Sequence, residues 1–288
     1  MNSLRGRDAP APYKTMIIDI HSHDFPNAIA TRAMAGMSHM TEGNLWPVGD
    51  GTLANHLDHL DLAGVDKAVS CPIATKPKMF EGLFRRACQI KDGELGERAQ
   101  RKIIPFASVH PLDPDVMTHL GMIAAAGLKG VKFHCYYQDF SLADRELWPV
   151  FAKIADLGLV VQCHCGADVS WRDERGKCGP NEIATLLKNV RPLKFIAAHL
   201  GGCDGYPPHA TDAVLECGAY VDTSVLHRTW FHDEEMRILR SWPRERILFG
   251  TDFPWVHYPE AISWVKSVRD PADWADLFGS NACRLLGL

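Results

Sequence analysis

Residues 130–164 read GVKFHCYYQDFSLADRELWPVFAKIADLGLVVQCH, and this stretch shows a strand–helix–strand pattern. Its two ends, Gly130–His134 and Val160–His164, are short apolar runs that finish in histidine. Between them apolar residues recur at helical spacing, at Leu147, Val150, Phe151 and Ile154. Two strands separated by a helix predict a parallel pair, because parallel strands need a long crossover connection.

The same alternation continues along the rest of the chain. Apolar strands are expected at Met16–His21, Lys67–Cys71, Ile103–Val109, Gly130–His134, Val160–His164, Phe195–His199, Ala219–Thr223 and Ile247–Thr251. Eight such units predict a single-domain α/β protein, a (β/α)8 TIM barrel over residues 16–288. The alternative is an open doubly wound sheet, which is disfavoured because no glycine-rich phosphate loop follows the first strand.

Composition excludes several classes of protein. The chain has 288 residues, 46% of them hydrophobic and 23% charged, which is too apolar for a disordered chain. Its formal charge is −4 and no segment is strongly basic, so no nucleic-acid partner is expected. No apolar run is long enough to span a bilayer, so no membrane association is expected.

Two further features indicate a cytoplasmic protein. The nine cysteines are scattered without a Cys-x-x-Cys pair, which favours reduced thiols over a disulfide framework. Residues 1–15 form a polar leader that lacks the apolar region of a signal peptide. Long loops are expected at residues 24–52, 72–82 and 165–181, where substrate specificity would reside.

Ligand-type side chains stand at the ends of several expected strands. His21 and His23 follow strand one and point to the same face, because alternate residues of a strand do so. His164, His199 and Asp252 end strands five, six and eight. A His-x-His pair alone carries little weight, but all these strand ends meet at the mouth of one barrel. Histidines with a carboxylate predict a catalytic divalent metal, most naturally zinc.

These motifs resemble a known family. The order His-x-His, His, His and Asp is similar to that of the amidohydrolase superfamily. The motifs that resemble its amidohydrolase-2 family, which includes aminocarboxymuconate-semialdehyde decarboxylase-like proteins, are Gly130–His134, Gln162–Gly166, Ala198–Gly202, Phe249–Trp255 and Leu277–Leu285.

The resemblance implies roles for individual residues. One divalent metal ion, Zn²⁺ or else Mn²⁺, would be held by residues matching His21, His23, His164 and Asp252. His199 would sit beside the activated water, so Asp252 and His199 are the expected catalytic residues. Binuclear relatives carry a carboxylated lysine on strand four, where Lys132 lies, but a single metal is favoured here.

Other residues are expected around the metal. Lys132 and His134 on strand four, Arg172 in the loop after His164, and Trp255 after Asp252 are candidate substrate-binding residues. Asp19 is a candidate for orienting a ligand histidine, with a simple structural role as the alternative. His56 and His59, one helical turn apart, are expected at the surface.

Three functions remain open from the residues. The first is hydrolysis of a carbonyl compound, a lactone, amide or ester of a small, carboxylated or aromatic-derived substrate. The second is metal-dependent, non-oxidative decarboxylation of an unsaturated or aromatic acid. The third is a non-catalytic metal-binding barrel. A homodimer is also expected, with Trp264, Trp274 and Phe278 as a candidate apolar patch.

Overall fold

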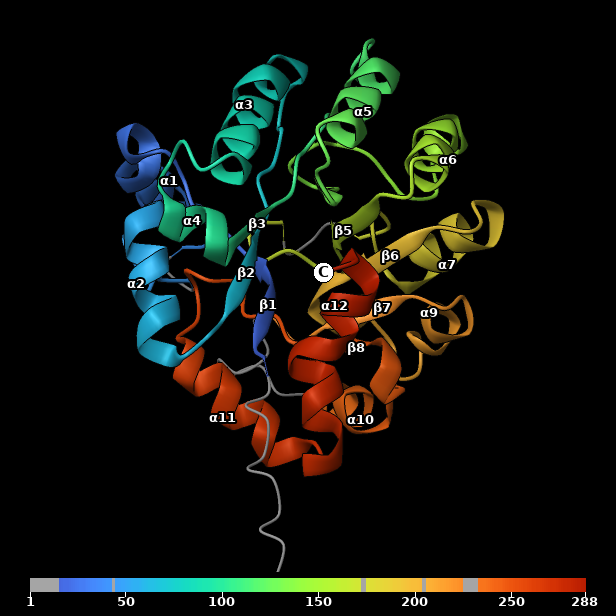
Figure 1. Cartoon of the computed structure of the whole chain (residues 1–288). Helices are drawn as coiled ribbons and strands as arrows, with labels where there is room; N and C mark the ends of the chain where they lie inside the picture. Colours follow the sequence, from blue (N-terminus) through green and yellow to red (C-terminus); the bar gives the residue numbers. More distant parts are fainter. Residues whose placement is uncertain (1–15, 43–44, 172–174, 204–205, 225–232) are drawn as a thin grey trace, which may run out of the picture.

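The computed structural model describes residues 16–42, 45–171, 175–203, 206–224 and 233–288. Its strands surround a central axis and its helices lie outside them (Figure 1). The strands are β1 Ile18–Ser22, β2 Lys67–Ser70, β3 Ile103–Pro105, β4 Gly130–His134, β5 Val160–His164, β6 Lys194–Ala197, β7 Tyr220–Asp222 and β8 Ile247–Leu248. All eight predicted strands are therefore present, two of them with the predicted bounds. The polar leader at residues 1–15 lies outside the described residues.

The helices alternate with the strands as predicted. They are α1 Asn27–Met40, α2 Leu53–Ala63, α3 Phe80–Lys91, α4 Glu97–Lys102, α5 Val116–Ala125, α6 Trp148–Asp156, α7 Pro180–Asn189, α8 Ala198–Gly202, α9 Asp212–Glu216, α10 Asp233–Ser241, α11 Tyr258–Val268 and α12 Asn281–Leu286. In α2, Thr52 caps the first turn and Gly64 ends the helix at φ 68°, a left-handed conformation that glycine adopts without strain. No helix of the described residues is both long and apolar enough to cross a bilayer.

The strands close into a barrel. Parallel pairing runs in the orders β1-β2-β3 and β4-β5-β6-β7-β8. Backbone hydrogen bonds connect the two sets: Lys132 N donates to Ala107 O over 2.9 Å, and Ile20 N donates to Phe249 O over 2.9 Å. The fold is thus a single (β/α)8 barrel, as the sequence predicts.

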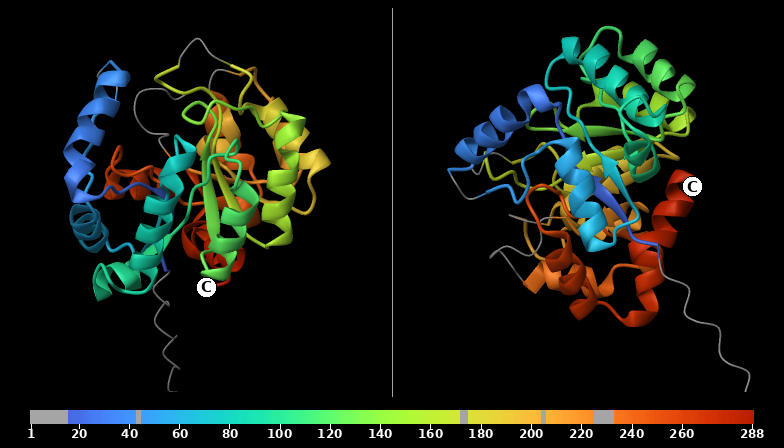
Figure 2. Two further views of the ribbon diagram at one scale, coloured as in Figure 1. Left: turned by 90° about the horizontal axis from the view of Figure 1, so that it is seen from above. Right: turned by 60° about the vertical axis from the view of Figure 1, so that its left-hand side comes forward.

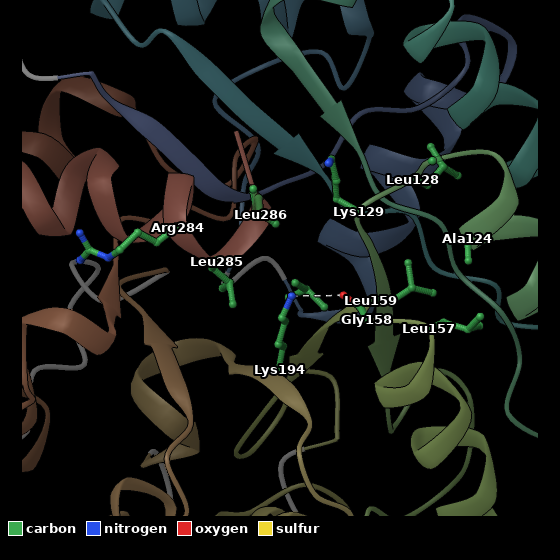
Figure 3. Close-up of a pocket in the computed structure, with 13 residues that line it drawn as sticks. Ala124, Leu128, Lys129, Leu157, Gly158, Leu159, Lys194, Arg284, Leu285 and Leu286 are labelled. Carbon is green, nitrogen blue, oxygen red and sulfur yellow. Dashed lines mark hydrogen bonds between the residues drawn. The ribbon is translucent and has the colours of Figure 1, made fainter.

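Apolar side chains fill the barrel interior and its lower end. Residues that alternate along the strands, such as Ile18, Ile20 and Val69, pack inside with Leu285 and Leu286 of α12. Helix α12 lies across the end where the strands begin (Figure 1). A small cavity of about 310 Å³ remains there, beside Lys129 and Lys194 (Figure 3). The other end of the barrel is therefore the one open to a ligand.

Several sequence-based boundaries are wrong. Strand β6 ends at Ala197, so His199 lies in the turn of α8 and not in the strand. The expected loop at residues 24–52 contains α1, whose Ala- and Met-rich sequence favours helix but lacks a strong apolar stripe. The expected loop at 72–82 contains the 3₁₀ turn η1, Pro77–Met79, and the start of α3.

Candidate active site

A pocket of about 890 Å³ opens at the carboxyl ends of the strands. All predicted site residues that the structure describes line it: His21, His23, Lys132, His134, His164, His199, Asp252 and Trp255. Arg172, the remaining predicted substrate-binding residue, lies outside the described residues. The candidates chosen because they stand at or near strand ends therefore all line one cavity. This is expected, because the strands of a closed barrel all point their carboxyl ends to the same mouth.

The first group of ligand-type atoms belongs to His21, His23 and Asp252. Asp252 Oδ1 lies 3.0 Å from His23 Nε2 and 3.5 Å from His21 Nε2. Ligands held tetrahedrally at zinc distances are separated from each other by about 3.3 Å, so this spacing suits one cation. Burial by itself would raise the pKa of Asp252, but the neighbouring His21 and His23 hold that pKa well below its usual range.

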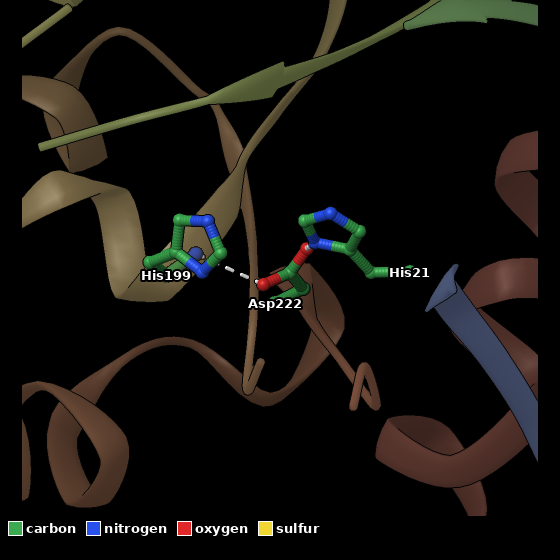
Figure 4. A group of neighbouring side chains, drawn as sticks. All are labelled: His21, His199 and Asp222. Carbon is green, nitrogen blue, oxygen red and sulfur yellow. Dashed lines mark hydrogen bonds and ion pairs between the residues drawn. The ribbon is translucent and has the colours of Figure 1, made fainter. Parts of the chain in front are cut away.

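Asp222 lies between His199 and His21, and its carboxylate orients the ring of His21 (Figure 4). Asp222 Oδ2 lies 3.0 Å from His21 Nδ1, and Asp222 Oδ1 accepts a hydrogen bond of 2.9 Å from the backbone N–H of His199. Since a buried carboxylate accepts a proton from Nδ1, the hydrogen-bond network assigns the lone pair of His21 to Nε2. Burial alone would raise the pKa of Asp222, but His21 and His199 hold it well below its usual range.

Lys132 on β4 lines the pocket beside His21. Its side chain is buried, and its Nζ lies 2.7 Å from His21 Nε2, the atom that carries the lone pair. Burial, and then the ammonium group of Lys132, lower the pKa of His21 to about 4. His21 is therefore neutral near pH 7, the form in which imidazole binds a metal.

A second group of ligand-type atoms comes from His134, His164 and Asp168. Asp168 Oδ2 lies 3.3 Å from His134 Nε2 and 3.7 Å from His164 Nε2. His164 Nε2 is buried and has no hydrogen-bond partner among the described residues. Burial lowers the pKa of both histidines well below the usual range, so both are neutral. The predicted fourth metal ligand, His164, thus lies in this second group rather than the first.

His199 belongs to a third group of ligand-type atoms, with His21 and Asp222, and also contacts the second group. Its Nε2 lies 3.0 Å from His164 Nδ1, and its Nδ1 lies 2.8 Å from Ser224 Oγ. Two glycines allow this contact: a Cβ at Gly202 would approach Gly166 N to 2.4 Å, so only glycine lets the loops after β5 and β6 meet.

Two catalytic candidates have unusual backbone angles. His199 has φ 56° and Asp252 has φ 58°, in the left-handed region that residues other than glycine seldom adopt. Such a conformation costs about 1 kcal/mol or more and persists where the surroundings hold it. For Asp252 the backbone N–H donates to His21 O over 2.7 Å, which ties the turn after β8 to β1.

Asp19 supports the site through the backbone. Asp19 Oδ1 accepts hydrogen bonds from His21 N (2.9 Å) and Thr251 N (3.0 Å), and Tyr258 OH donates to Asp19 Oδ2 over 2.9 Å. Burial raises the pKa of Asp19 to about 6, against the lowering effect of these donors. Asp19 therefore joins β1 to β8 and does not touch the imidazole of His21, whose ring is oriented by Asp222.

His56 is not at the surface as the sequence suggested. It is fully buried, stacks on Phe253 with ring centroids 4.8 Å apart, and its Nε2 lies 2.9 Å from Tyr258 OH. Helix α11 covers this side of α2, which helical spacing alone does not reveal. Phe278 is also buried, against Phe249, so it cannot contribute to a surface patch.

Sequence reasoning missed four residues that shape the site: Asp168, Asp222, Ser224 and Arg86. Asp222 ends a strand, so the rule used for the histidines would have found it. Arg86 lies on α3 and reaches the pocket with its Nη2 at 2.5 Å from Asp24 Oδ1. No local pattern marks such a contact, because the two residues are far apart in the sequence.

A family model described as Amidohydrolase matches residues 75–288. The chain belongs to the amidohydrolase-2 family. This finding confirms the resemblance stated from the motifs, and the His/Asp groups of this amidohydrolase agree with a metal-dependent family. No curated protein matches the chain significantly.

Solved structures share the fold of this amidohydrolase. An uncharacterised TIM-barrel protein from Bordetella bronchiseptica has 16% identity and a TM-score of 0.73, over 94% of this chain and 98% of its own. A 5-carboxyvanillate decarboxylase from Sphingomonas paucimobilis has 14% identity and a TM-score of 0.70, over 96% and 100%. A probable 2-pyrone-4,6-dicarboxylic acid hydrolase from Acinetobacter baumannii has 15% identity and a TM-score of 0.65, over 94% and 99%.

Proposed function

We propose that this protein is a metal-dependent hydrolase that attacks the carbonyl group of a lactone, amide or ester. The observation that carries this proposal is the group of His21 Nε2, His23 Nε2 and Asp252 Oδ1, which lines the pocket next to His199, whose ring centroid lies 5.3 Å from that of His21. This arrangement combines a site for one cation with two side chains able to exchange a proton.

The residues present fit a divalent metal ion, Zn²⁺ or Mn²⁺. Two imidazoles and a carboxylate form the first group, and His164 Nε2, which has no hydrogen-bond partner among the described residues, is a further buried donor in the same pocket. We propose His21, His23, His164 and Asp252 as its ligands. A bound divalent cation would polarise a carbonyl group and lower the pKa of water.

The chain's own residues supply the proton chemistry. Asp252 Oδ1 and His199 Nε2 are the candidate proton carriers, and both residues line the pocket. The hydrogen-bond chain from Asp222 through Ser224 to His199 Nδ1 leaves the lone pair of His199 on Nε2. His199 Nε2 therefore accepts the hydrogen bond from His164 Nδ1, which leaves the lone pair of His164 on Nε2. Asp222 and Ser224 keep the ring of His199 in place.

Substrate binding is assigned to the remaining polar groups of the pocket. Lys132 and Arg86 supply cationic donors, which suit a carboxylated substrate. His134 and Trp255 also line the cavity, where an aromatic ring can stack against them. We propose a small molecule, carboxylated or derived from an aromatic compound, as the substrate, and we keep Arg172 as a proposed contact.

Decarboxylation of an unsaturated or aromatic acid is the second candidate function. The buried ammonium of Lys132, 2.7 Å from His21 Nε2, favours it, because a carboxylate next to the metal ligands would be bound there. The 5-carboxyvanillate decarboxylase, which has the same barrel fold, also supports this second candidate function. A barrel that binds metal without catalysing a reaction is the third candidate function.

One experiment separates the three functions. The purified protein is analysed for metal and then supplied with lactones, amides, esters and aromatic acids, while proton release and carbon dioxide are both recorded. Proton release without carbon dioxide is the expected result. Carbon dioxide without a hydrolysis product would establish the decarboxylase instead, and metal uptake with no turnover would favour the non-catalytic barrel.

A further inference from the structure

The pocket extends beyond its histidine-lined end, and many of the residues that line the remainder are apolar. At about 890 Å³ it lies near the upper end of the ~300–1,000 Å³ range of small-molecule sites. Two helices line the part away from the histidines. We call this part the apolar arm and define it by Ile29, Ala33, Met37, Met79, Leu83 and Ala87.

The apolar arm is built from two matching stripes. Ile29, Ala33 and Met37 are spaced by four residues along α1, so they share one face of that helix. Met79, Leu83 and Ala87 have the same spacing from η1 into α3 and line the same cavity. In both views of Figure 2, α1 (blue) lies on the side of the barrel away from α12, which is the side of the pocket mouth.

The stripe on α1 is only partly covered by packing, because Ala33 and Met37 are half-buried against the core and Ile29 is exposed. Ala30 and Met34, on the neighbouring face, are buried, whereas Ile29 is 37% exposed. Helix α1 therefore uses one face for the core and presents a second apolar face to the cavity. A cavity that joins such a surface to a reactive polar end suits a ligand with one polar and one apolar end.

A charged pair, Arg86 and Asp24, also lines the pocket. Arg86 Nη2 contacts Asp24 Oδ1, and Asp24 directly follows His23. Arg86 has five N–H donors and this contact uses one of them, so others can bind a carboxylate oxygen. A polar substrate group would be held at the histidine end, and its apolar body would extend along α1 and α3.

We propose that the substrate carries an apolar chain or ring system of several carbon atoms, and that the apolar arm binds this body. The inference rests on the proposed function, because it places the reacting carbonyl at the histidine end. It adds the substrate class: an acyl or arylalkyl compound rather than a compact dicarboxylate. Specificity for the substrate then comes from α1 and α3, which lie outside the ring of strands.

Gly82 provides a substitution that tests the arm without disturbing the fold. It lies in α3, lines the pocket, and a Cβ added there would meet no atom within 4 Å. Gly82→Phe therefore fills part of the arm while removing a glycine that weakens the helix. Gly36→Phe is the matched control, since Gly36 lies in α1, has the same open surroundings and does not line the pocket.

The experiment measures binding, so that it does not depend on turnover. Butyrate, hexanoate, octanoate and decanoate are titrated into the wild-type protein and both variants by calorimetry. We expect affinity to rise about fourfold for each methylene that the arm buries. The rise should stop at a shorter chain in Gly82→Phe and should be unchanged in Gly36→Phe.

Three results would overturn the proposal that the apolar arm binds the body of the substrate. The first is an affinity that does not change with chain length, and the second is an equal loss in both glycine variants. The third is a two-chain particle, measured by light scattering, that dissociates when octanoate is added, because the arm would then be covered by a second copy.

Failure of the arm and failure of the proposed function give different outcomes. If short esters are hydrolysed but affinity does not rise with chain length, the arm is wrong and the hydrolase stands. If affinity rises with chain length but no lactone, amide or ester is hydrolysed, the arm stands and the hydrolase is wrong.

Discussion

Asp252 Oδ1 faces two histidines at once, which gives this residue two separable roles. A metal ligand needs an oxygen lone pair, which asparagine keeps. A proton carrier needs a basic carboxylate, which asparagine lacks. We predict that Asp252→Asn retains most of its metal and loses about 10²-fold or more in kcat. His21→Ala should instead lose the metal, because a ligand nitrogen disappears. Metal analysis and steady-state kinetics of both variants measure these outcomes. Near wild-type turnover of metal-loaded Asp252→Asn would transfer the proton role to His199.

Asp222 acts on the metal group from behind, since its contact with His21 Nδ1 places the lone pair on Nε2. Asp222→Asn replaces an acceptor with an amide that can donate, so His21 loses its preferred tautomer. We predict a 10–100-fold weaker metal affinity, measured by competition with a chelator. Asp212→Asn, at an exposed site beside Arg237, is the control. Equal metal affinity in both variants would contradict the role of Asp222.

The contact between the turn after β1 and helix α3 depends on one ion pair. Asp24 is buried, and its carboxylate contacts Arg86 and Ser70. Removing one partner of a buried pair leaves an uncompensated charge, which costs about 3 kcal/mol. Arg86→Met should therefore lower the free energy of unfolding in urea by roughly that amount. Arg85→Met, at an exposed position on the same helix, should change it little. An unfolding energy equal to that of wild type would show that the pair is not important for α3.

The same pair predicts how stability depends on pH. Burial alone would raise the pKa of Asp24, but His56, Arg86 and Ser70 hold it well below its usual range. Because its folded pKa lies below the unfolded value of about 3.9, this stabilisation is fully present above that pH and is lost progressively as the pH falls from there towards the lower folded pKa. Urea unfolding at about pH 5 and pH 3 should show a smaller loss in Asp24→Asn than in wild type. An identical loss in both proteins would assign the acid sensitivity to other carboxylates.

The exposure of tryptophan side chains on the outer helices bears on the oligomeric state of the protein. Trp264 in α11 and Trp274 after it remain partly exposed, although Phe278, the third residue of the predicted patch, is buried. We propose a homodimer, because paired outer helices often form the isologous contact of a two-fold dimer. Light scattering of the purified protein should give the mass of two chains, and Trp264→Ser should shift it towards one. A single-chain mass for the wild type would refute the dimer.

The architecture was predictable because it repeats. Apolar runs such as Val160–His164 occur eight times with helical segments such as Leu147–Ile154 between them, and closure into a barrel pairs every strand on both edges. Helix α1 was missed because Asn27–Met40 divides its apolar residues between the core and the pocket, so its pattern is weak. The buried position of His56 was missed because α11, which covers it, is about 200 residues further along the chain.

The sequence alone determined the barrel, the mouth at which it works and most of the side chains found there, including His21, His23, His164 and Asp252. It could do so because strand periodicity and strand ends are local properties, and barrel closure brings all strand ends together. The pairing of those side chains depended on tertiary structure. His164 meets His199 through the approach of Gly166 and Gly202, Asp222 reaches His21 across the barrel, and Arg86 meets Asp24 from α3. Such contacts join residues that are distant in the chain, so their distances follow from packing and not from any local pattern.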